Sequence, residues 1–171
     1  MSFASSFSLA SLASSPRNVL RDFWDRVGRL PGGRALFSRA IGLAAPYTGT
    51  IGAKVEVLRH GHSEVVLDDR RAVRNHLDCV HAIALANLAE LTGNVALAYS
   101  LPDDARFIVA GLSIEYLKKA RGRIRGVCDC PIPDTSAREE YAVEVVMVDP
   151  VGDVVARATL RTLVGPKRSL E

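Results

Sequence analysis

The spacing of hydrophobic residues changes several times along the chain, and each change marks a predicted element. In residues 17–30 apolar side chains recur at helical intervals with Arg and Asp between them, which predicts an amphipathic helix. A Pro-Gly-Gly sequence follows, and residues 35–45 predict a second short helix that stops before Pro46. We interpret residues 17–45 as an N-terminal helical extension, preceded by a Ser- and Ala-rich tail, residues 1–16, that we expect to be disordered.

The pattern then becomes typical of strands around one long helix. Residues 50–67 are rich in β-branched side chains and predict a hairpin that turns at His60, Gly61 and His62. Residues 79–99 contain no proline and are apolar on nearly every side, which predicts a buried helix. Four more strand-like runs follow, at residues 107–118, 122–130, 140–149 and 154–164.

The four later runs have faces of different polarity. In residues 107–118, Ile108 and Leu112 share an apolar face, and Glu115 makes the other face more polar. The run at 154–164 alternates in the same way, and the short links between runs predict antiparallel hairpins between successive strands. The expected fold of residues 46–166 is an α+β domain, in which an antiparallel sheet of about six strands wraps one central helix.

Composition and charge exclude several classes of protein. The net charge of +3 is small and the basic residues are scattered, so we expect no nucleic-acid partner. Polar residues interrupt the most apolar segment before it reaches the roughly 18 apolar residues of a membrane-spanning helix. Three cysteines without zinc or redox spacing favour reduced thiols in the cytoplasm. His60 and His62 flank a turn glycine without an evident third ligand, so we expect no metal.

Polar groups in and before the central helix are the candidates for chemistry. Asn87, Glu90 and Asn94 recur every three or four residues and form one stripe on the helix. A carboxylate in an apolar setting is normally paired, open to water or used in catalysis, so Glu90 is a candidate. A contact with solvent or with another subunit is the alternative. At the helix start, free backbone N–H groups could polarise a carbonyl.

These residues resemble the phenylacetyl-CoA thioesterase-like branch of the hotdog-fold thioesterases. That branch has an Asn, then His-Gly-Gly, then an acid on the helix, and the matching positions are Asn75, His81 and Glu90. Ala82 and Ile83 replace the two glycines, which is closer to an uncharacterised bacterial branch of thioesterase-like hotdog proteins. The replacement narrows the space near the thioester and affects activity more than fold.

The resemblance implies a hydrolytic mechanism and a role for each residue. The backbone N–H of Ala82 or Ile83 would polarise the thioester carbonyl. Glu90 would act as general base on water or as nucleophile, and Asn75 would orient the water or the carbonyl. His81 would position the helix start. The substrate would be an acyl-CoA, with no other cofactor.

The resemblance also implies an assembly and a place for CoA. Its members form the site between two subunits, so we expect a homodimer or a dimer of dimers. Lys118, Lys119 and Arg121 stand where similar proteins bind the CoA phosphates, although an ordinary solvated turn would explain them equally well. Asn87 is the further candidate for substrate contact, whereas Cys79 is expected to be a small core residue.

Three functions fit this sequence to different degrees. The first is an acyl-CoA thioesterase. The second is a non-catalytic acyl-CoA-binding or assembly protein, which the altered glycine pair and the extra N-terminal helices would fit. The third, a hotdog hydratase or dehydratase, ranks last because the Pro-rich loop of that family is absent from the sequence.

Overall fold

The structure is a computed structural model that describes residue 15 and residues 17–167. Apart from Ser15, the predicted tail lies outside the described residues. The elements, in chain order, are α2 (Val19–Val27), α3 (Gly33–Ala44), α4 (Pro46–Gly49), β1 (Lys54–Arg59), β2 (His62–Leu67), the 3-10 helix η1 (Arg71–Val73), α5 (Ala82–Ser100), β3 (Ala105–Tyr116), β4 (Ile124–Asp129), β5 (Glu139–Val148) and β6 (Val154–Pro166).

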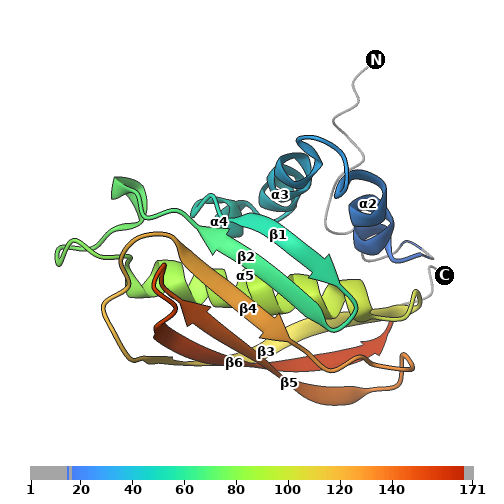
Figure 1. The fold of residues 1–171 in the computed structure, drawn as a ribbon. Helices are drawn as coiled ribbons and strands as arrows, with labels where there is room; N and C mark the ends of the chain where they lie inside the picture. The colour runs from blue at the N-terminus through green and yellow to red at the C-terminus, as the bar shows by residue number, and fades with distance from the viewer. Residues whose placement is uncertain (1–14, 16, 168–171) are drawn as a thin grey trace.

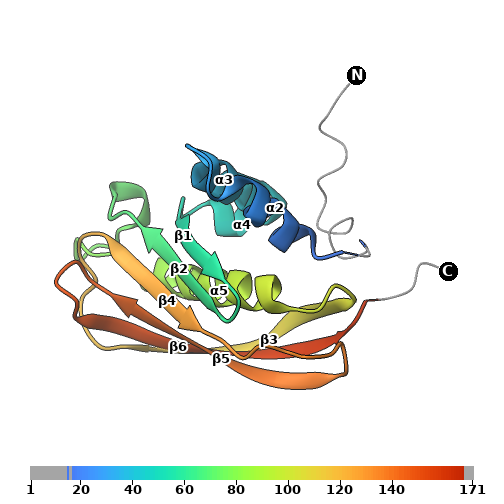
Figure 2. The ribbon, with the colours of Figure 1, turned by 45° about the vertical axis from the view of Figure 1, so that its right-hand side comes forward.

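One curved sheet wraps around α5, and the N-terminal helices lie beside β1 (Figures 1 and 2). The strand order is β1-β2-β4-β5-β6-β3, and every pair of neighbours is antiparallel. The predicted α+β architecture of one central helix and six strands is therefore confirmed. The N-terminal helices are an addition on one side of it.

The middle of α5 packs tightly on the sheet. Leu88, Ala89 and Ala96 are completely buried. Gly93 lets β5 and β6 approach the helix, because a Cβ atom there would lie 2.4 Å from Cδ1 of Leu160 and 3.1 Å from Cγ1 of Val143. This close packing fixes the rotation of α5, and therefore fixes which of its residues face away from the sheet.

Length and composition would allow α5 to cross a membrane. The structure instead buries 67% of its most apolar 18-residue window inside the protein. That burial is the arrangement expected of a core helix that is apolar on nearly every side.

The predicted hairpin between β3 and β4 is wrong. Strand β3 pairs with β6, from Ala105 opposite Pro166 to Tyr116 opposite Ala156, and forms the edge of the sheet farthest from β1. Residues 117–123 then cross to β4, three strand positions away. Seven extended residues reach about 23 Å and three strand spacings need only about 14 Å, so a short link does not require adjacent strands.

The two faces of β3 also differ from the sequence expectation. Its apolar residues Ile108, Leu112 and Tyr116 are 65%, 41% and 44% exposed. The inward residues include Phe107 and Val109, and a bulge follows Val109. In β6 the alternation was predicted correctly over its central part, where Ala156, Ala158 and Leu160 are buried and Arg157 and Arg161 are exposed.

The N-terminal helices are tied to the far end of α5. Asn18 Nδ2 donates to the carbonyls of Ala98 (2.7 Å) and Leu101 (3.2 Å). The Tyr99 hydroxyl donates to Asp25 on α2 at 2.7 Å. The short helix α4, which the sequence did not predict, follows α3 and lies against α5. The extension therefore forms a second wall along α5, next to the β1 edge of the sheet (Figure 2).

Candidate active site

The start of α5 is held by a histidine cap. His81 is the N-cap residue, and its Nδ1 accepts a hydrogen bond from the backbone N–H of Ile83 at 3.0 Å. The N–H of Ile83, one of the two predicted oxyanion donors, is therefore already used in a hydrogen bond. Ala82 is the first helical residue, so its N–H has no acceptor within the helix, and no other described residue accepts from it. Ala82 is the donor that remains available.

Asn75 folds the loop that precedes α5. Its Oδ1 accepts from the backbone N–H of Leu77 at 2.9 Å and of Cys79 at 3.4 Å, and its own N–H donates to the Cys79 carbonyl at 2.9 Å. The amide oxygen is thus used inside the loop, which leaves the Nδ2 group for a ligand. Cys79 is buried and carries a free thiol.

The polar stripe of α5 contains three different environments. Asn87 is 5% exposed, and its Nδ2 donates to the Tyr47 carbonyl at 3.2 Å, while its Oδ1 has no partner among the described residues. Glu90 and Asn94 are half-buried. Within residues 17–167, Glu90 makes neither a hydrogen bond nor an ion pair, so its carboxylate is available to a ligand or to another subunit.

The two candidate groups on α5 are far apart within one chain. Glu90 follows Ala82 by eight residues. At a helical rise of about 1.5 Å per residue, the two residues lie about 12 Å apart along the axis. Reacting groups must approach to about 3 Å. One thioester carbon therefore cannot be reached by both groups of the same chain.

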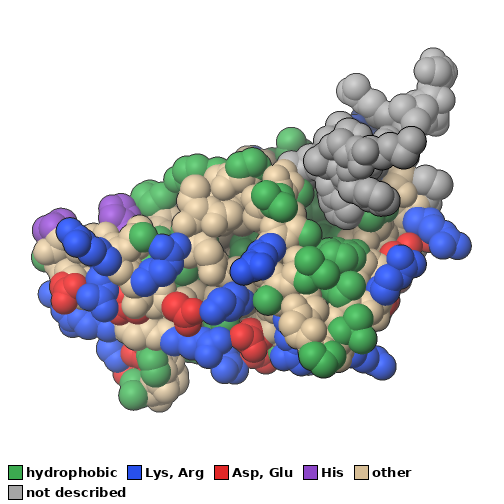
Figure 3. Space-filling view, turned by 90° about the horizontal axis from the view of Figure 1, so that it is seen from above, with side chains coloured by type: hydrophobic (Ala, Val, Ile, Leu, Met, Phe, Trp, Pro, Cys, Tyr) green, Lys and Arg blue, Asp and Glu red, His purple; other side chains and the backbone are tan. Residues whose placement is uncertain are grey.

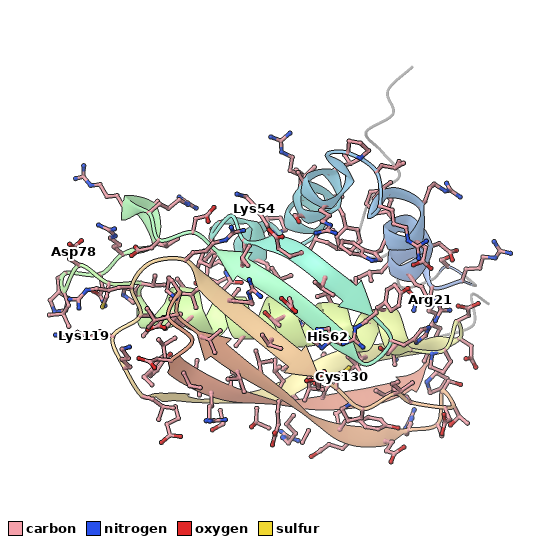
Figure 4. The ribbon with its side chains drawn as sticks, in the orientation of Figure 1. Arg21, Lys54, His62, Asp78, Lys119 and Cys130 are labelled. Carbon is pink, nitrogen blue, oxygen red and sulfur yellow. The ribbon has the colours of Figure 1, made fainter. Side chains whose placement is uncertain are left out.

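The predicted CoA-binding cations differ in how far they are already paired. Lys118 Nζ donates to Asp149 at 2.8 Å and also contacts Asp153, and these carboxylates raise the pKa of Lys118. Arg121 donates two long bonds, of 3.4 Å, to the carbonyls of Leu77 and Asp78. Lys119 makes no ion pair with a described residue. Lys119 and Asp78 lie at the end of the molecule where α5 begins (Figure 4), and Lys, Arg and His side chains are frequent there (Figure 3).

Tyr116 is a residue of this site that the sequence did not predict. Its hydroxyl donates to the Ala82 carbonyl at 3.0 Å, which places the end of β3 beside the start of α5. Burial raises the pKa of Tyr116 further above the neutral range, in which a tyrosine hydroxyl is protonated and can donate. Nothing in the sequence could reveal this neighbour, because the contact depends on the pairing of β3 with β6.

The histidine hairpin has a structural explanation. His62 lies on β2 (Figure 4). Its Nδ1 is 2.6 Å from Asp129 across the β2 and β4 pair, and its Nε2 is 3.7 Å from Glu64. Asp129 is largely exposed. In the part of the chain that the structure describes, no group of three or more His, Cys, Asp or Glu residues could hold a metal.

Comparison with solved structures extends this description. A structural-genomics protein, APC5556, is 35% identical; the match covers 86% of this chain and 98% of that protein, with a TM-score of 0.75. A protein of unknown function and probable thioesterase, PA5026 from Pseudomonas aeruginosa, is 24% identical over 80% of this chain and 97% of its own, with a TM-score of 0.68. The protein smu.793 from Streptococcus mutans, solved with acetyl-CoA, is 20% identical over 67% and 90%, with a TM-score of 0.57.

A family model shows to which protein family the chain belongs. No curated protein matches the chain. Residues 33–164 match the model of a domain of unknown function, DUF4442, which therefore includes α3 as well as the sheet and α5. The predicted resemblance to uncharacterised thioesterase-like hotdog proteins is confirmed. The chain belongs to the DUF4442 family and has the hotdog fold of thioesterase family proteins.

Proposed function

We propose that the protein is an acyl-CoA thioesterase whose active site forms between two copies of the chain. The observation that carries this proposal is the carboxylate of Glu90, half-buried on the core helix and without a partner among residues 17–167. A group held in this way costs stability unless water or a ligand reaches it. Solved proteins with the same fold, described as thioesterases, support the choice of reaction.

The separation of groups on α5 supports a site shared by two subunits. Because Ala82 and Glu90 of one chain are about 12 Å apart along the helix, both can act on one thioester only when they come from different chains. A twofold axis between antiparallel helices would place the Glu90 of each chain near the Ala82 of the other. Two equivalent sites would result.

Strand β3 is the surface that we propose for this pairing. It is an edge strand of 12 residues, and its exposed side chains include the apolar or aromatic Ile108, Leu112 and Tyr116 beside polar ones such as Glu115. A long, exposed, apolar edge strand is a template for pairing with another chain. Tyr116 touches the start of α5, so pairing along β3 would bring that helix start to the interface.

The chemistry of this arrangement is general-base hydrolysis. Glu90 takes a proton from a water molecule while the water oxygen bonds to the thioester carbon. The N–H of Ala82 from the other subunit donates to the oxyanion that develops. The C–S bond then breaks, and the CoA thiolate receives the proton from Glu90. The products are a carboxylic acid and free CoA, and the carboxylate is regenerated.

Recognition of CoA in this proposal uses the cations near the helix start. Lys119 and Arg121 would contact the phosphates, whereas Lys118 contributes less because two carboxylates neutralise it. The bound acetyl-CoA of the Streptococcus mutans protein is in keeping with such a ligand. Asn87, with its unpaired Oδ1, and the Nδ2 of Asn75 would supply polar contacts to the substrate.

A non-catalytic acyl-CoA-binding protein is the second candidate. The Ile83 side chain is 55% exposed beside the proposed donor, at a position where the resembling branch has glycine. This bulk could hold the thioester away from water. Binding of CoA thioesters without release of CoA would then be the outcome.

Release of free thiol from a panel of CoA thioesters distinguishes the two candidates. We expect the purified full chain to hydrolyse at least one of acetyl-, octanoyl-, palmitoyl- and phenylacetyl-CoA, with the acid and CoA formed in equal amounts. Calorimetric binding of the same thioesters is measured in parallel. Binding without any thiol release would reject the thioesterase and favour the second candidate.

A further inference from the structure

A cavity separates the N-terminal helices from the second half of α5. Its volume is about 330 Å³, within the range of about 300 to 1,000 Å³ that is usual for small-molecule sites. One wall comes from α2 and α3, and the other from α5 and the start of β3. Most lining side chains are apolar, including Leu20, Phe23, Phe37, Ile41, Val95 and Phe107.

The cavity begins next to the proposed catalytic acid. Glu90 does not line it, but Leu91, the next residue, does. Asn94, one helical turn after Glu90 on the same side of α5, also lines it. A group attached to a carbonyl carbon near Glu90 could therefore enter the cavity and run along α5 towards its C-terminal end.

We propose that this cavity binds the hydrocarbon chain of the acyl group, and that the N-terminal helices select acyl chains of medium length. The inference rests on the proposed function and names its class of substrate. A hydrocarbon chain gains free energy from an apolar wall in proportion to the surface that it removes from water. The α2 and α3 side chains supply that wall, which gives the extension a role.

The far end of the cavity sets the limit on chain length. Arg106 and Lys167 line this end. Arg106 Nε donates to the Pro166 carbonyl at 3.1 Å, and Lys167 Nζ donates to the Arg17 carbonyl at 3.1 Å. A chain longer than the cavity would press methylene groups against these cations and strip them of water, which is unfavourable. Octanoyl groups should therefore be favoured over palmitoyl groups.

Two positions on α3 provide a matched test. Ala40 is half-buried and lines the cavity. Leu36 lies one turn earlier, is 54% exposed and does not line it. Ala40→Phe adds an aromatic ring to the cavity, whereas Leu36→Phe places the same ring in solvent. Thermal unfolding of both variants shows whether each retains the fold.

Trp24 provides a binding signal that does not depend on turnover. It is the only tryptophan of the chain, and its ring packs edge-to-face on Phe37 with centroids 4.9 Å apart. Phe37 lines the cavity, so a bound chain should change the emission of Trp24. Octanoyl-CoA should bind the wild type and Leu36→Phe equally, and Ala40→Phe about tenfold or more weakly. Equal binding by Ala40→Phe, or an equal loss for CoA alone, would overturn the inference.

Hydrolysis of acetyl- and octanoyl-CoA separates this inference from the proposed function. We expect Ala40→Phe to lower kcat/KM for octanoyl-CoA and to leave that for acetyl-CoA unchanged. If the wild type binds octanoyl-CoA in the cavity but releases no CoA, the thioesterase proposal fails and the chain-binding site stands. If the wild type hydrolyses octanoyl-CoA and Ala40→Phe does so at the same rate, the cavity is not the acyl site, although the thioesterase proposal stands.

Discussion

Replacement of Glu90 by glutamine is expected to lower kcat for the best acyl-CoA substrate by about 10²- to 10⁴-fold, the usual contribution of a general base. The amide keeps the size and polarity of the side chain but cannot take a proton from water. Stability should change by less than about 0.5 kcal/mol, because the carboxylate makes no hydrogen bond or ion pair with a described residue. Thiol release and urea unfolding measure the two quantities.

Glu144→Gln is the matched control for this variant. Glu144 is exposed on β5, away from α5, so the same chemical change there should leave both activity and stability unaltered. If Glu90→Gln unfolds at lower urea concentration and keeps its kcat, the carboxylate has a structural role. The proposed mechanism would then lose its base.

Ala82→Pro should remove the oxyanion donor without disturbing the helix. Proline has no N–H, and it is favoured at the first helical position, which Ala82 occupies. His81 before it has φ −64° and ψ 141°, a conformation that a following proline accepts. We expect kcat to fall by about 10²- to 10³-fold, as when one oxyanion-hole donor is lost, with the melting temperature unchanged.

Ala82→Ser separates the lost donor from a change of side chain. It keeps the backbone N–H and should retain most of the activity in the thiol-release assay. Full activity of Ala82→Pro, with Ala82→Ser also active, would show that the oxyanion is stabilised elsewhere. The N–H of Ile83 is not a ready substitute, because His81 Nδ1 accepts its hydrogen bond.

Local patterns predicted the individual elements well. The helix at α5 was recognisable because it is apolar on nearly every side. The hairpin of β1 and β2 was recognisable because a glycine, Gly61, separates two short runs of β-branched residues. In the structure Gly61 adopts a φ of 70° at the turn, which favours glycine. The buried alternation of β6 also follows from its own residues. Each of these features depends on neighbours in the sequence, which a periodicity can reveal.

Features that depend on distant segments were not predictable. The partner of β3 is β6, whose paired residues lie 40 to 61 positions further along the chain, and a seven-residue link permits several strand orders. The apolar face of β3 resembles a core face although it is exposed; pairing with another chain, which we propose for this edge strand, would bury it. A single sequence does not separate these two cases.

The candidate site was predictable only where its residues are neighbours in the sequence. The sequence alone brought Glu90 and the start of α5 into consideration, since both lie on one helix. The use of the Ile83 N–H by His81 and the pairing of Lys118 with two carboxylates depend on side-chain geometry. The contact of Tyr116 with Ala82 depends on the strand order.

A mixed dimer tests the shared active site most directly. Glu90→Gln and Ala82→Pro chains with different affinity tags are co-expressed, and dimers that carry both tags are isolated. If each site takes Glu90 from one chain and Ala82 from the other, the mixed dimer has one intact site and one site that carries both substitutions. About half of the wild-type activity should then return. A mixed dimer as inactive as its parents would show that no site combines groups from two subunits, which would contradict the proposed active site.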